Sequence, residues 1–256
     1  MEGTKLNTKG KKKDLIIYGA GGFGREVAWL VERINKISPT WNILGFIDGD
    51  ESIQGTTING YPVLGRDDNV RDYPDAYYVI AVGASRTREK IVKSMKAINS
   101  EFKYATLIDP NAEISELVTI GEGSIICAHT LITVNISIGS HVIVNLDCTI
   151  GHDAVLKDYV TLYPSVNISG CTHIGYASEL GTGMQIIQGI RIGNYSIVGA
   201  GAVVVKDIPE NCTAVGSPAK PIKYHDLIGQ NPDRGGYCLS NIQRNVFRSV
   251  KNWRAA

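Results

Sequence analysis

An aliphatic residue recurs at every sixth position from Ile108 to Val204, and this period constrains the fold more than any other feature. If Ile, Leu and Val fill about a quarter of positions, unbroken agreement at seventeen positions has a chance probability on the order of 10⁻¹⁰. A period of six would place successive members on different faces of a helix, so a helix is excluded. We call these residues index residues: Ile108, Ile114, Ile120, Ile126, Ile132, Ile138, Val144, Ile150, Leu156, Leu162, Ile168, Ile174, Leu180, Ile186, Ile192, Val198 and Val204.

A second inward position follows each index residue by four and carries a small or aliphatic residue, such as Val142, Ala154 or Val166. Glycine often follows the index residue directly, as at Gly139 and Gly151. Two inward positions per hexad, with glycine at the corners, describe short strands joined by tight turns. Stacked coils of this kind form a parallel β-solenoid in which each coil buries its neighbour. We expect this domain at residues 108–209.

A strand, a glycine-rich turn and a helix precede the repeats. Residues 15–18 are apolar, residues 19–24 read GAGGFG, and apolar residues from Val27 to Ile34 recur at the spacing of an amphipathic helix. Glycines let a backbone approach a phosphate, and a helix N-terminus favours negative charge. The sequence therefore predicts a nucleotide-binding turn, although the glycines alone are also compatible with a plain strand-to-helix turn.

Two further apolar runs complete the first domain. The apolar run at residues 43–47 is followed by Asp48, near the usual place of a ribose- or base-binding acid. The run at residues 77–82 leads into Gly83 and then into a helical stretch at residues 87–98. We expect a Rossmann-like βαβ domain over residues 14–107, too short for the six-stranded dinucleotide fold, which disfavours a nicotinamide cofactor. Arg88 is a candidate phosphate contact or, alternatively, a solvated helix residue. The candidate nucleotide-sugar contacts are Gly19, Gly21, Gly22, Asp48, Ala81, Val82, Gly83 and Arg88.

Composition excludes several classes of function. The 256-residue chain carries 26 Lys and Arg against 25 Asp and Glu, so nothing indicates a nucleic-acid surface, and no apolar run is long enough for a membrane span. Residues 1–13 are polar and Lys-rich and predict a disordered lead-in without a signal peptide. Five cysteines without C-x-x-C spacing argue against a disulfide framework and a zinc ribbon. We expect a cytoplasmic protein with reduced thiols and no metal.

The hexads, the glycine-turn domain and the exit segment at residues 215–220 (VGSPAK) together resemble the sialic acid O-acetyltransferase-like family of hexapeptide-repeat acyltransferases. Within it, the chain looks closest to the bacterial nucleotide-amino-sugar N-acetyltransferases, and the resemblance covers residues 14–223. It implies a left-handed β-helix with three hexads per coil, acetyl-CoA as co-substrate, and a homotrimer with the pantetheine arm between adjacent prisms. Residues 210–256 form the exit segment and a C-terminal extension. One helix face is expected there, made of Ile242, Val246, Phe247, Val250 and Trp253.

His152 is positionally singular among the histidines of the repeat, because it alone lies two residues after an index residue. Transfer of an acyl group to an amine needs a base near neutral pH, and a neighbouring carboxylate can orient the imidazole. In the resembled family a catalytic histidine followed by an acidic residue stands at this place, matched here by His152 and Asp153, and Asn145 matches an upstream asparagine. The alternative is a surface histidine on a solenoid.

Two departures from the family pattern matter. Several relatives have a second histidine near the thioester where this chain has Thr161, whose hydroxyl could still donate a hydrogen bond; a backbone N–H is the other candidate for stabilising the oxyanion. Relatives often have a histidine where Phe23 stands, which puts a polar contact from that turn in doubt. The residues that the resemblance implies for the acetyl-CoA wall are Thr161, Gly170, Gly181, Thr182, Gly199 and Ala200.

The sequence therefore favours an acetyl-CoA-dependent N-acetyltransferase acting on a nucleotide-linked amino sugar, most simply a UDP-4-amino-4,6-dideoxyhexose, in surface glycan biosynthesis. A rival enzyme hypothesis transfers the acetyl group to a sugar hydroxyl, such as that of a sialic acid. A rival from another class is a non-catalytic, trimeric scaffold that binds a nucleotide sugar without turnover.

Overall fold

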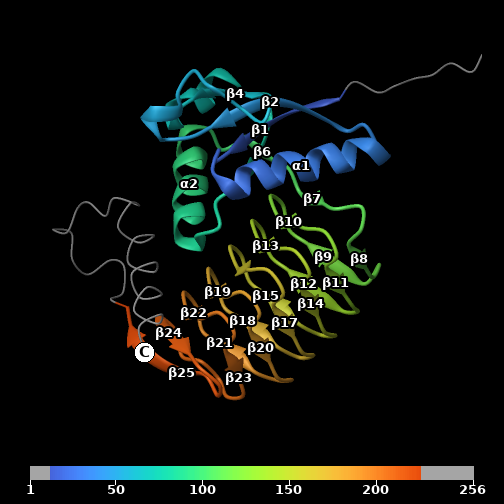
Figure 1. The fold of residues 1–256 in the computed structure, drawn as a ribbon, viewed down its shortest axis with the longest axis vertical. Coiled ribbons are helices and arrows are strands. Elements are labelled where there is room, and N and C mark those ends of the chain that lie inside the picture. The colour runs from blue at the N-terminus through green and yellow to red at the C-terminus, as the bar shows by residue number, and fades with distance from the viewer. Residues whose placement is uncertain (1–11, 226–256) are drawn as a thin grey trace, which may run out of the picture. The chain divides into compact units, whose positions relative to one another are not determined.

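The computed structural model describes residues 12–225. Its N-terminal part is a six-stranded sheet in the order β3-β4-β2-β1-β5-β6, parallel except for β3 (Figure 1). Two of the six strands, β3 and β6, are only two residues long and carry no apolar run, and β3 is antiparallel. The strands are β1 (Lys13–Tyr18), β2 (Trp41–Ile47), β3 (Thr57–Ile58), β4 (Tyr61–Gly65), β5 (Tyr77–Ile80) and β6 (Lys103–Tyr104).

Two α-helices flank this sheet, α1 (Gly22–Ile37) and α2 (Ser85–Ile98), and two 3₁₀ helices connect its strands, η1 (Glu51–Ile53) and η2 (Asp67–Asp72). Alternate residues of β1 serve different cores, as the two-residue period of a strand requires. Leu15 and Ile17 pack in one cluster with α1, whereas Ile16 and Tyr18 pack in another with α2.

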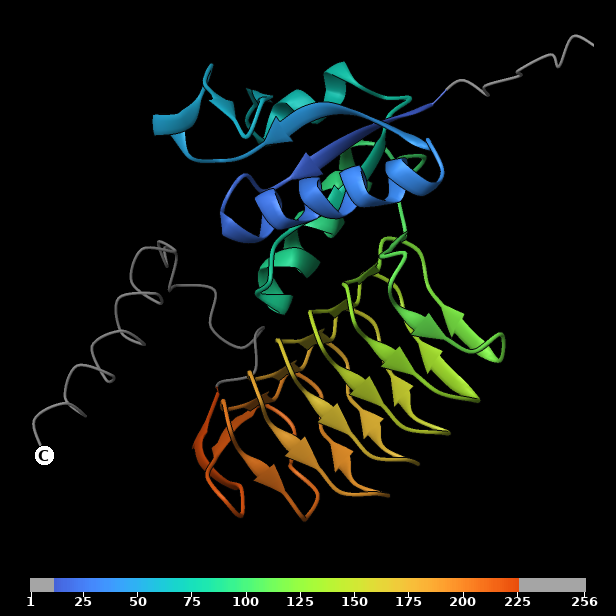
Figure 2. The ribbon, with the colours of Figure 1, turned by 45° about the vertical axis from the view of Figure 1, so that its right-hand side comes forward.

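Three sheets, parallel except for the terminal strand β25, make the β-helix, and Figure 2 shows its coils as a stack of rungs. From β7 to β20 each strand pairs with the strand eighteen residues later, as in Ile125↔Ile143, so three hexads close one coil. The first face holds β7 (Leu107–Ile108), β10 (Ile125–Ile126), β13 (Ile143–Val144), β16 (Thr161–Leu162), β19 (Glu179–Leu180), β22 (Ile197–Val198), β24 (Cys212–Val215) and β25 (Lys220–Tyr224). The second holds β8 (Glu113–Ile114), β11 (Leu131–Ile132), β14 (Thr149–Ile150), β17 (Asn167–Ile168), β20 (Gln185–Ile186) and β23 (Val203–Val204). The third holds β9 (Val118–Ile120), β12 (Ile136–Ile138), β15 (Val155–Leu156), β18 (His173–Ile174) and β21 (Arg191–Ile192).

The predicted index residues form the core of the β-helix. From Ile126 to Val204 every one of them is buried in a single cluster. Ile114 and Ile120 are only partly buried, and Ile108 is 39% exposed. These exceptions belong to the first coil, which has no preceding coil to cover it.

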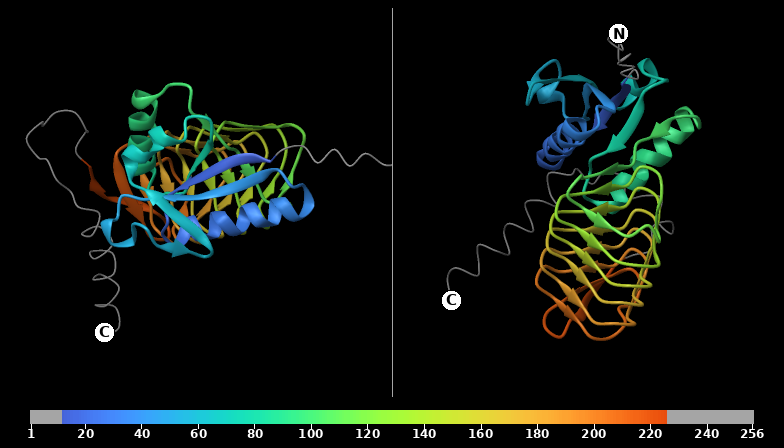
Figure 3. Two further views of the ribbon diagram at one scale, coloured as in Figure 1. Left: turned by 90° about the horizontal axis from the view of Figure 1, so that it is seen from above. Right: turned by 90° about the vertical axis from the view of Figure 1, so that its right-hand side faces the viewer.

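The coils turn at three corners, and Figure 3 shows the stacked coils from two further sides. We name them after one residue each: the Asn145 corner joins the first face to the second, the His152 corner joins the second to the third, and the Tyr159 corner returns to the first. The third residue after many index residues has a left-handed backbone, for example Asp147 (φ 59°), Asp153 (φ 59°) and Tyr159 (φ 60°). Asp and Asn tolerate this conformation better than most residues.

The first domain and the β-helix share their cores. Val27 and Val31 of α1 lie in one cluster with Leu107 and Ile125 of the first face. Within residues 12–225 no helix is long and apolar enough to cross a membrane. The helix face expected between Ile242 and Trp253 and most of the lead-in at 1–13 lie outside the described residues.

Candidate active site

His152 and Asp153 lie together in the turn after β14, at the His152 corner. The His152 Nδ1 and an Asp153 carboxylate oxygen are 2.8 Å apart, and both side chains are half exposed. The hydrogen bond with His152, followed by one from Asn135, lowers the pKa of Asp153, so this carboxyl is ionised near neutral pH. An anionic acceptor at Nδ1 favours the tautomer that leaves Nε2 unprotonated. This arrangement is chemically suited to a general base with an orienting carboxylate.

Gly170 makes room for the imidazole of His152. A Cβ atom at residue 170 would lie 2.5 Å from the Nε2 and Cε1 atoms of His152. An alanine here would therefore push the exposed His152 ring out of this position. The sequence reasoning assigned Gly170 to the coenzyme wall and missed this role, which the eighteen-residue coil period could have indicated.

Asn145 is not brought to His152 within one chain. It lies at the Asn145 corner, its side-chain oxygen accepts the backbone N–H of Leu146 (2.7 Å), and β14 separates the two corners. Gly181, Thr182, Gly199 and Ala200 share the Asn145 corner in later coils. A Cβ at Gly181 would lie 2.5 Å from the backbone nitrogen of Ala200, so close coil stacking alone accounts for that glycine.

The glycine turn is built as a strand-to-helix cradle. Gly19 has a left-handed backbone (φ 102°), and a Cβ at Gly24 would lie 1.9 Å from the carbonyl oxygen of Gly19. Gly21 has an ordinary backbone (φ −68°) and nothing within 4 Å of its Cβ direction. Neither strain nor crowding explains Gly21, and open space beside a helix N-terminus suits a bound phosphate.

Asp48 and the loop at residues 81–83 border the glycine turn. One carboxylate oxygen of Asp48 accepts the backbone N–H of Ala20 (2.8 Å), and the other accepts that of Asp50 (2.9 Å). The Cβ direction of Gly19 points to the carbonyl of Ala81 and the side chain of Val82 at 3.0 and 3.3 Å. The residues predicted to bind the nucleotide, apart from Arg88, therefore surround one turn.

Arg88 does not face a ligand, and both predictions for it, a phosphate contact and a solvated residue, were wrong. Its side chain is 1% exposed. It donates to the carbonyls of His141 (2.9 Å), Val82 (2.6 Å) and Tyr159 (2.7 Å). Burial lowers the pKa of its guanidinium to about 10, so the side chain is still charged at neutral pH. Its hydrogen bonds join the first domain to the β-helix.

Thr161 was placed on the coenzyme wall, and that prediction also was wrong. The residue is 1% exposed and lies on the first face against the N-terminal domain. Its hydroxyl donates to the Gly83 carbonyl (2.8 Å) and accepts from Arg88 (2.8 Å). It therefore has no free hydroxyl hydrogen for an oxyanion.

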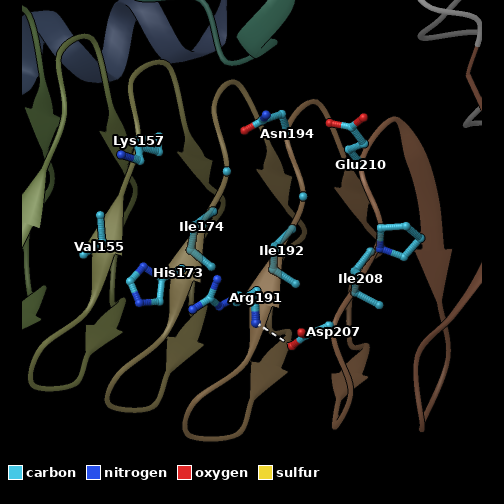
Figure 4. Close-up of a pocket in the computed structure, with 13 residues that line it drawn as sticks. Val155, Lys157, His173, Ile174, Arg191, Ile192, Asn194, Asp207, Ile208 and Glu210 are labelled. Carbon is cyan, nitrogen blue, oxygen red and sulfur yellow. Dashed lines mark hydrogen bonds between the residues drawn. The ribbon is translucent and has the colours of Figure 1, made fainter.

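A pocket of about 540 Å³ lies on the third face of the β-helix, and sequence reasoning missed it (Figure 4). Figure 4 shows His173 and Arg191 on neighbouring strands, with the Arg191 backbone N–H donating to Asp207 (2.8 Å). Lys157 adds a third basic side chain. Asp207 and Glu210 also line the pocket, so its charge is mixed and does not by itself select an anionic ligand. The coil period, which stacks residue 173 on residue 191, could have indicated the pocket.

Comparison with known proteins agrees with this architecture. Residues 14–95 match the family model described as the PglD N-terminal domain. The acetyltransferase domain of PglB from Neisseria gonorrhoeae is 34% identical with a TM-score of 0.74, covering 82% of this chain and all (100%) of that one. WeeI from Acinetobacter baumannii is 35% identical with a TM-score of 0.72, and the match covers 82% of this chain and 100% of WeeI. A perosamine N-acetyltransferase from Caulobacter crescentus, solved with CoA and GDP-perosamine, is 30% identical with a TM-score of 0.72, covering 81% and 96%.

The matches to curated sequences are shorter. A serine acetyltransferase of Synechococcus elongatus is 36% identical over 28% of this chain and 33% of its own length. A galactoside O-acetyltransferase of Lactococcus lactis is 32% identical over 33% of this chain and 50% of its own length. The chain thus spans half or less of the length of these two relatives.

Fold and site together define an acyltransferase of the β-helix class. The chain belongs to the hexapeptide-repeat acyltransferase family, and its solved relatives include an acetyltransferase domain and a perosamine N-acetyltransferase. The predicted fold class is confirmed: a Rossmann-like α/β domain followed by a left-handed parallel β-helix.

Proposed function

We propose that this protein is an acetyl-CoA-dependent N-acetyltransferase that modifies the amine of a nucleotide-linked amino sugar, most simply a UDP-4-amino-4,6-dideoxyhexose. The observation that carries the proposal is the pair of His152 and Asp153, 2.8 Å apart on an exposed corner of the β-helix. The perosamine N-acetyltransferase solved with CoA and GDP-perosamine supports the same type of acceptor. The proposal has three narrower parts. The enzyme works in the cytoplasm, its product is used to build a surface glycan, and the chain belongs to the sialic acid O-acetyltransferase-like branch.

The mechanism is direct transfer from thioester to amine. The sugar nitrogen attacks the acetyl carbonyl carbon, the new C–N bond forms, and Nε2 of His152 takes a proton from nitrogen. The tetrahedral intermediate then collapses, the C–S bond breaks, and the imidazolium returns a proton to the departing coenzyme thiolate. Asp153 holds Nδ1–H and stabilises the imidazolium. A base of this kind is typically worth about 10²–10⁴ in rate.

The nucleotide part of the acceptor is proposed to bind at the glycine turn. The open space at Gly21 and Gly22 lies at the N-terminus of the sixteen-residue helix α1, where amide N–H groups and the helix dipole attract a diphosphate. Asp48 fixes the turn through the N–H of Ala20. Loop residues Ala81 to Gly83 form the opposite wall.

A homotrimer is proposed to complete the site. Asn145 and His152 occupy different corners of one prism, so a second copy is needed to bring the Asn145 corner, with Gly181, Thr182, Gly199 and Ala200, against a His152 corner. The His152 corner exposes a row of large apolar side chains beside the base, which suits burial against another chain. These residues are Leu117, Val134, Ile187 and Val205.

The test is thiol release from acetyl-CoA against UDP-, dTDP- and GDP-linked amino sugars. We expect release with one nucleotide class and none with the free amino sugar. His152→Ala should lower kcat by about 10²–10⁴. Asp153→Asn keeps a residue that tolerates φ 59° and removes only the charge, so it should retain the fold with reduced kcat. Turnover of His152→Ala within a few-fold of wild type would exclude the mechanism.

A hydroxyl acceptor is the second candidate, favoured by the match to the galactoside O-acetyltransferase. It would be recognised by thiol release with a free sugar or free sialic acid and by the lack of nucleotide affinity. Failure to bind acetyl-CoA at all would favour the non-catalytic scaffold.

A further inference from the structure

We propose that His152, Asp153 and Cys171 form a binding site for a thiophilic divalent cation, and that Zn²⁺ is the ion it fits best. A ring nitrogen of His152, a carboxylate oxygen of Asp153 and the sulfur of Cys171 all lie within 4.8 Å of one another. Ligand atoms of a tetrahedral zinc are separated by roughly 3.5 Å, given bonds of about 2.0–2.3 Å. Small side-chain rotations therefore suffice to close the three ligands around one ion.

The backbone of two neighbouring coils sets this arrangement. Asp153 and Cys171 are one coil apart, and both have a left-handed backbone at the His152 corner (φ 59° and 56°). The Cys171 N–H donates to the carbonyl oxygen of His152 (2.8 Å). The three ligands are thus held on rigid, stacked turns, and only their exposed side chains have to move.

The donor set selects the ion. Nitrogen, sulfur and one carboxylate oxygen suit zinc, whereas Mg²⁺ and Ca²⁺ require mainly oxygen ligands. Three protein ligands leave a fourth position open for water. The Asn135 amide donates to the Asp153 carboxylate (3.3 Å) and can orient it as an outer-shell partner.

The other described cysteines do not offer a comparable ligand. Cys127 and Cys148 are buried, and burial raises the pKa of each thiol to about 12. Cys212 is buried as well, whereas Cys171 is partly exposed. An ion from solution therefore reaches the thiol of Cys171 far more readily than those three.

No metal was expected from the sequence, because residues 152, 153 and 171 match no linear metal-binding motif. The coil period brings them together, since residue 171 stacks on residue 153. This proposal replaces the expectation of a protein without a metal site.

Occupation by zinc would block the proposed chemistry. A bound ion fixes the imidazole of His152 and occupies a nitrogen lone pair that proton transfer requires, so zinc is expected to inhibit turnover. The expected inhibition rests on the proposed role of His152 as the base. The expected binding of zinc does not rest on that role. Because the thiol must lose its proton and the imidazole must be neutral, zinc binding should weaken as the pH falls.

The decisive experiment is a cobalt titration of the full, metal-free chain, followed by displacement with Zn²⁺ and calorimetry. We expect one equivalent of Co²⁺ to give the ultraviolet charge-transfer band of a cobalt–thiolate bond and the visible bands of a tetrahedral ion. Cys171→Ser should abolish the charge-transfer band and weaken zinc affinity at least about tenfold. Cys171→Ala and His152→Ala should also weaken zinc binding, with thermal unfolding showing that each variant is folded.

Two matched controls locate the ligands. Cys238→Ser changes the one remaining cysteine of the sequence, and His173→Ala removes an exposed histidine one coil away on the third face; both should keep the spectrum. Absence of a thiolate band in the wild type, its survival in Cys171→Ser, or its loss in Cys238→Ser would overturn the proposal.

An activity assay separates this proposal from the proposed function. Zinc should inhibit wild-type turnover reversibly, and Cys171→Ser should need at least about tenfold more zinc relative to its own zinc-free rate. If spectra place the ion on His152 and turnover is unaffected, His152 is not the base, although the metal site stands. If no substrate turns over, the cobalt titration still decides.

Discussion

The carboxylate of Glu179 in the β-helix caps helix α2 of the first domain at Ser85. One oxygen of Glu179 accepts both the backbone N–H (2.8 Å) and the hydroxyl (2.9 Å) of Ser85, and the other accepts the hydroxyl of Tyr163 (3.0 Å). The helix has no side-chain cap from its own N-cap residue, Ala84. Glu179, which is distant in sequence, therefore supplies the hydrogen-bond acceptor for the first turn of the helix that a Ser, Thr or Asp at the N-cap usually supplies.

Glu179→Gln is expected to destabilise the protein. The amide lacks one acceptor and the negative charge at the helix N-terminus, so the free energy of unfolding should fall by about 1.5–3 kcal/mol in urea denaturation. Glu113→Gln is the matched control, because Glu113 occupies the same outward hexad position but is exposed; it should change stability by less than about 0.5 kcal/mol. Equal effects of the two substitutions would contradict the capping role.

Gly170→Ala should impair turnover while leaving the fold nearly intact. The new methyl group would displace the His152 ring, whose nearest atoms lie 2.5 Å from the Cβ position. A catalytic group misplaced by about 1 Å can lose about 10²-fold in rate, and thermal unfolding should shift little. In a double-mutant cycle, Gly170→Ala should have no further effect on kcat once His152 is alanine. An additional loss there would place the role of Gly170 elsewhere.

His141 should make the protein acid-sensitive. Its ring lies between Tyr104 and Tyr159, with centroid distances of 4.7 and 5.2 Å, and neither ring nitrogen has a hydrogen-bond partner among residues 12–225. Burial, aided by Lys96 and Arg88, lowers its pKa to about 3. In the unfolded chain the pKa of this histidine is about 6.5, so between these two pKa values the unfolded state binds more protons than the folded state. The free energy of unfolding therefore decreases as the pH falls, by up to about 1.4 kcal/mol per pH unit.

His141→Asn should flatten this pH dependence, measured as unfolding free energy from pH 7 to 4, although the variant is less stable at neutral pH. Asparagine tolerates the backbone φ of 55° at this residue. His129→Asn is the control at an exposed corner position with φ 60°, and it should keep the wild-type slope. Parallel curves for wild type and His141→Asn would show that another group causes the acid sensitivity.

The ion pair between Arg33 and Asp109 should contribute strongly at neutral pH. Two hydrogen bonds of 2.6 and 2.9 Å join them, and the Asp109 side chain is 1% exposed. Burial alone would raise the pKa of Asp109, but the bonds from Arg33 and the Asn111 N–H outweigh it, and the pKa is lowered. Its stabilisation is therefore complete above the unfolded pKa of about 3.9 and is lost as the pH falls through the folded value.

Asp109→Asn should cost about 3 kcal/mol in denaturant unfolding at pH 7, and the difference from wild type should shrink below about pH 4. Glu51→Gln breaks the Arg66–Glu51 pair, whose side chains are 55% and 77% exposed, and should cost less than about 1 kcal/mol. A constant cost of Asp109→Asn down to pH 3 would mean that its charge is not what stabilises the interface.

The repeat could be read from sequence because its inward positions depend only on neighbouring coils. Every inward residue from Ile126 to Val204 meets equivalents eighteen residues away, so the pattern in the chain is the pattern in the core. The same period also placed His152 and Asp153 on one corner.

The outward positions could not be read in this way. Thr161 and Leu131 occupy the same hexad position, yet Thr161 is 1% exposed beneath the first domain whereas Leu131 is 42% exposed. Which face a second domain covers depends on its own shape, and this information is absent from the period. For the same reason Arg88 looked like a solvated helix residue or a phosphate contact.

The pairing of each rung with the rung eighteen residues later limits how such a chain can change its length. Insertion or deletion of one residue within a strand turns the inward side chains that follow outward. Loss or duplication of a whole coil leaves all remaining contacts equivalent. Natural size variation among related chains should therefore occur in steps of one coil or as loops extruded at corners, and His152 would keep its surroundings through either change.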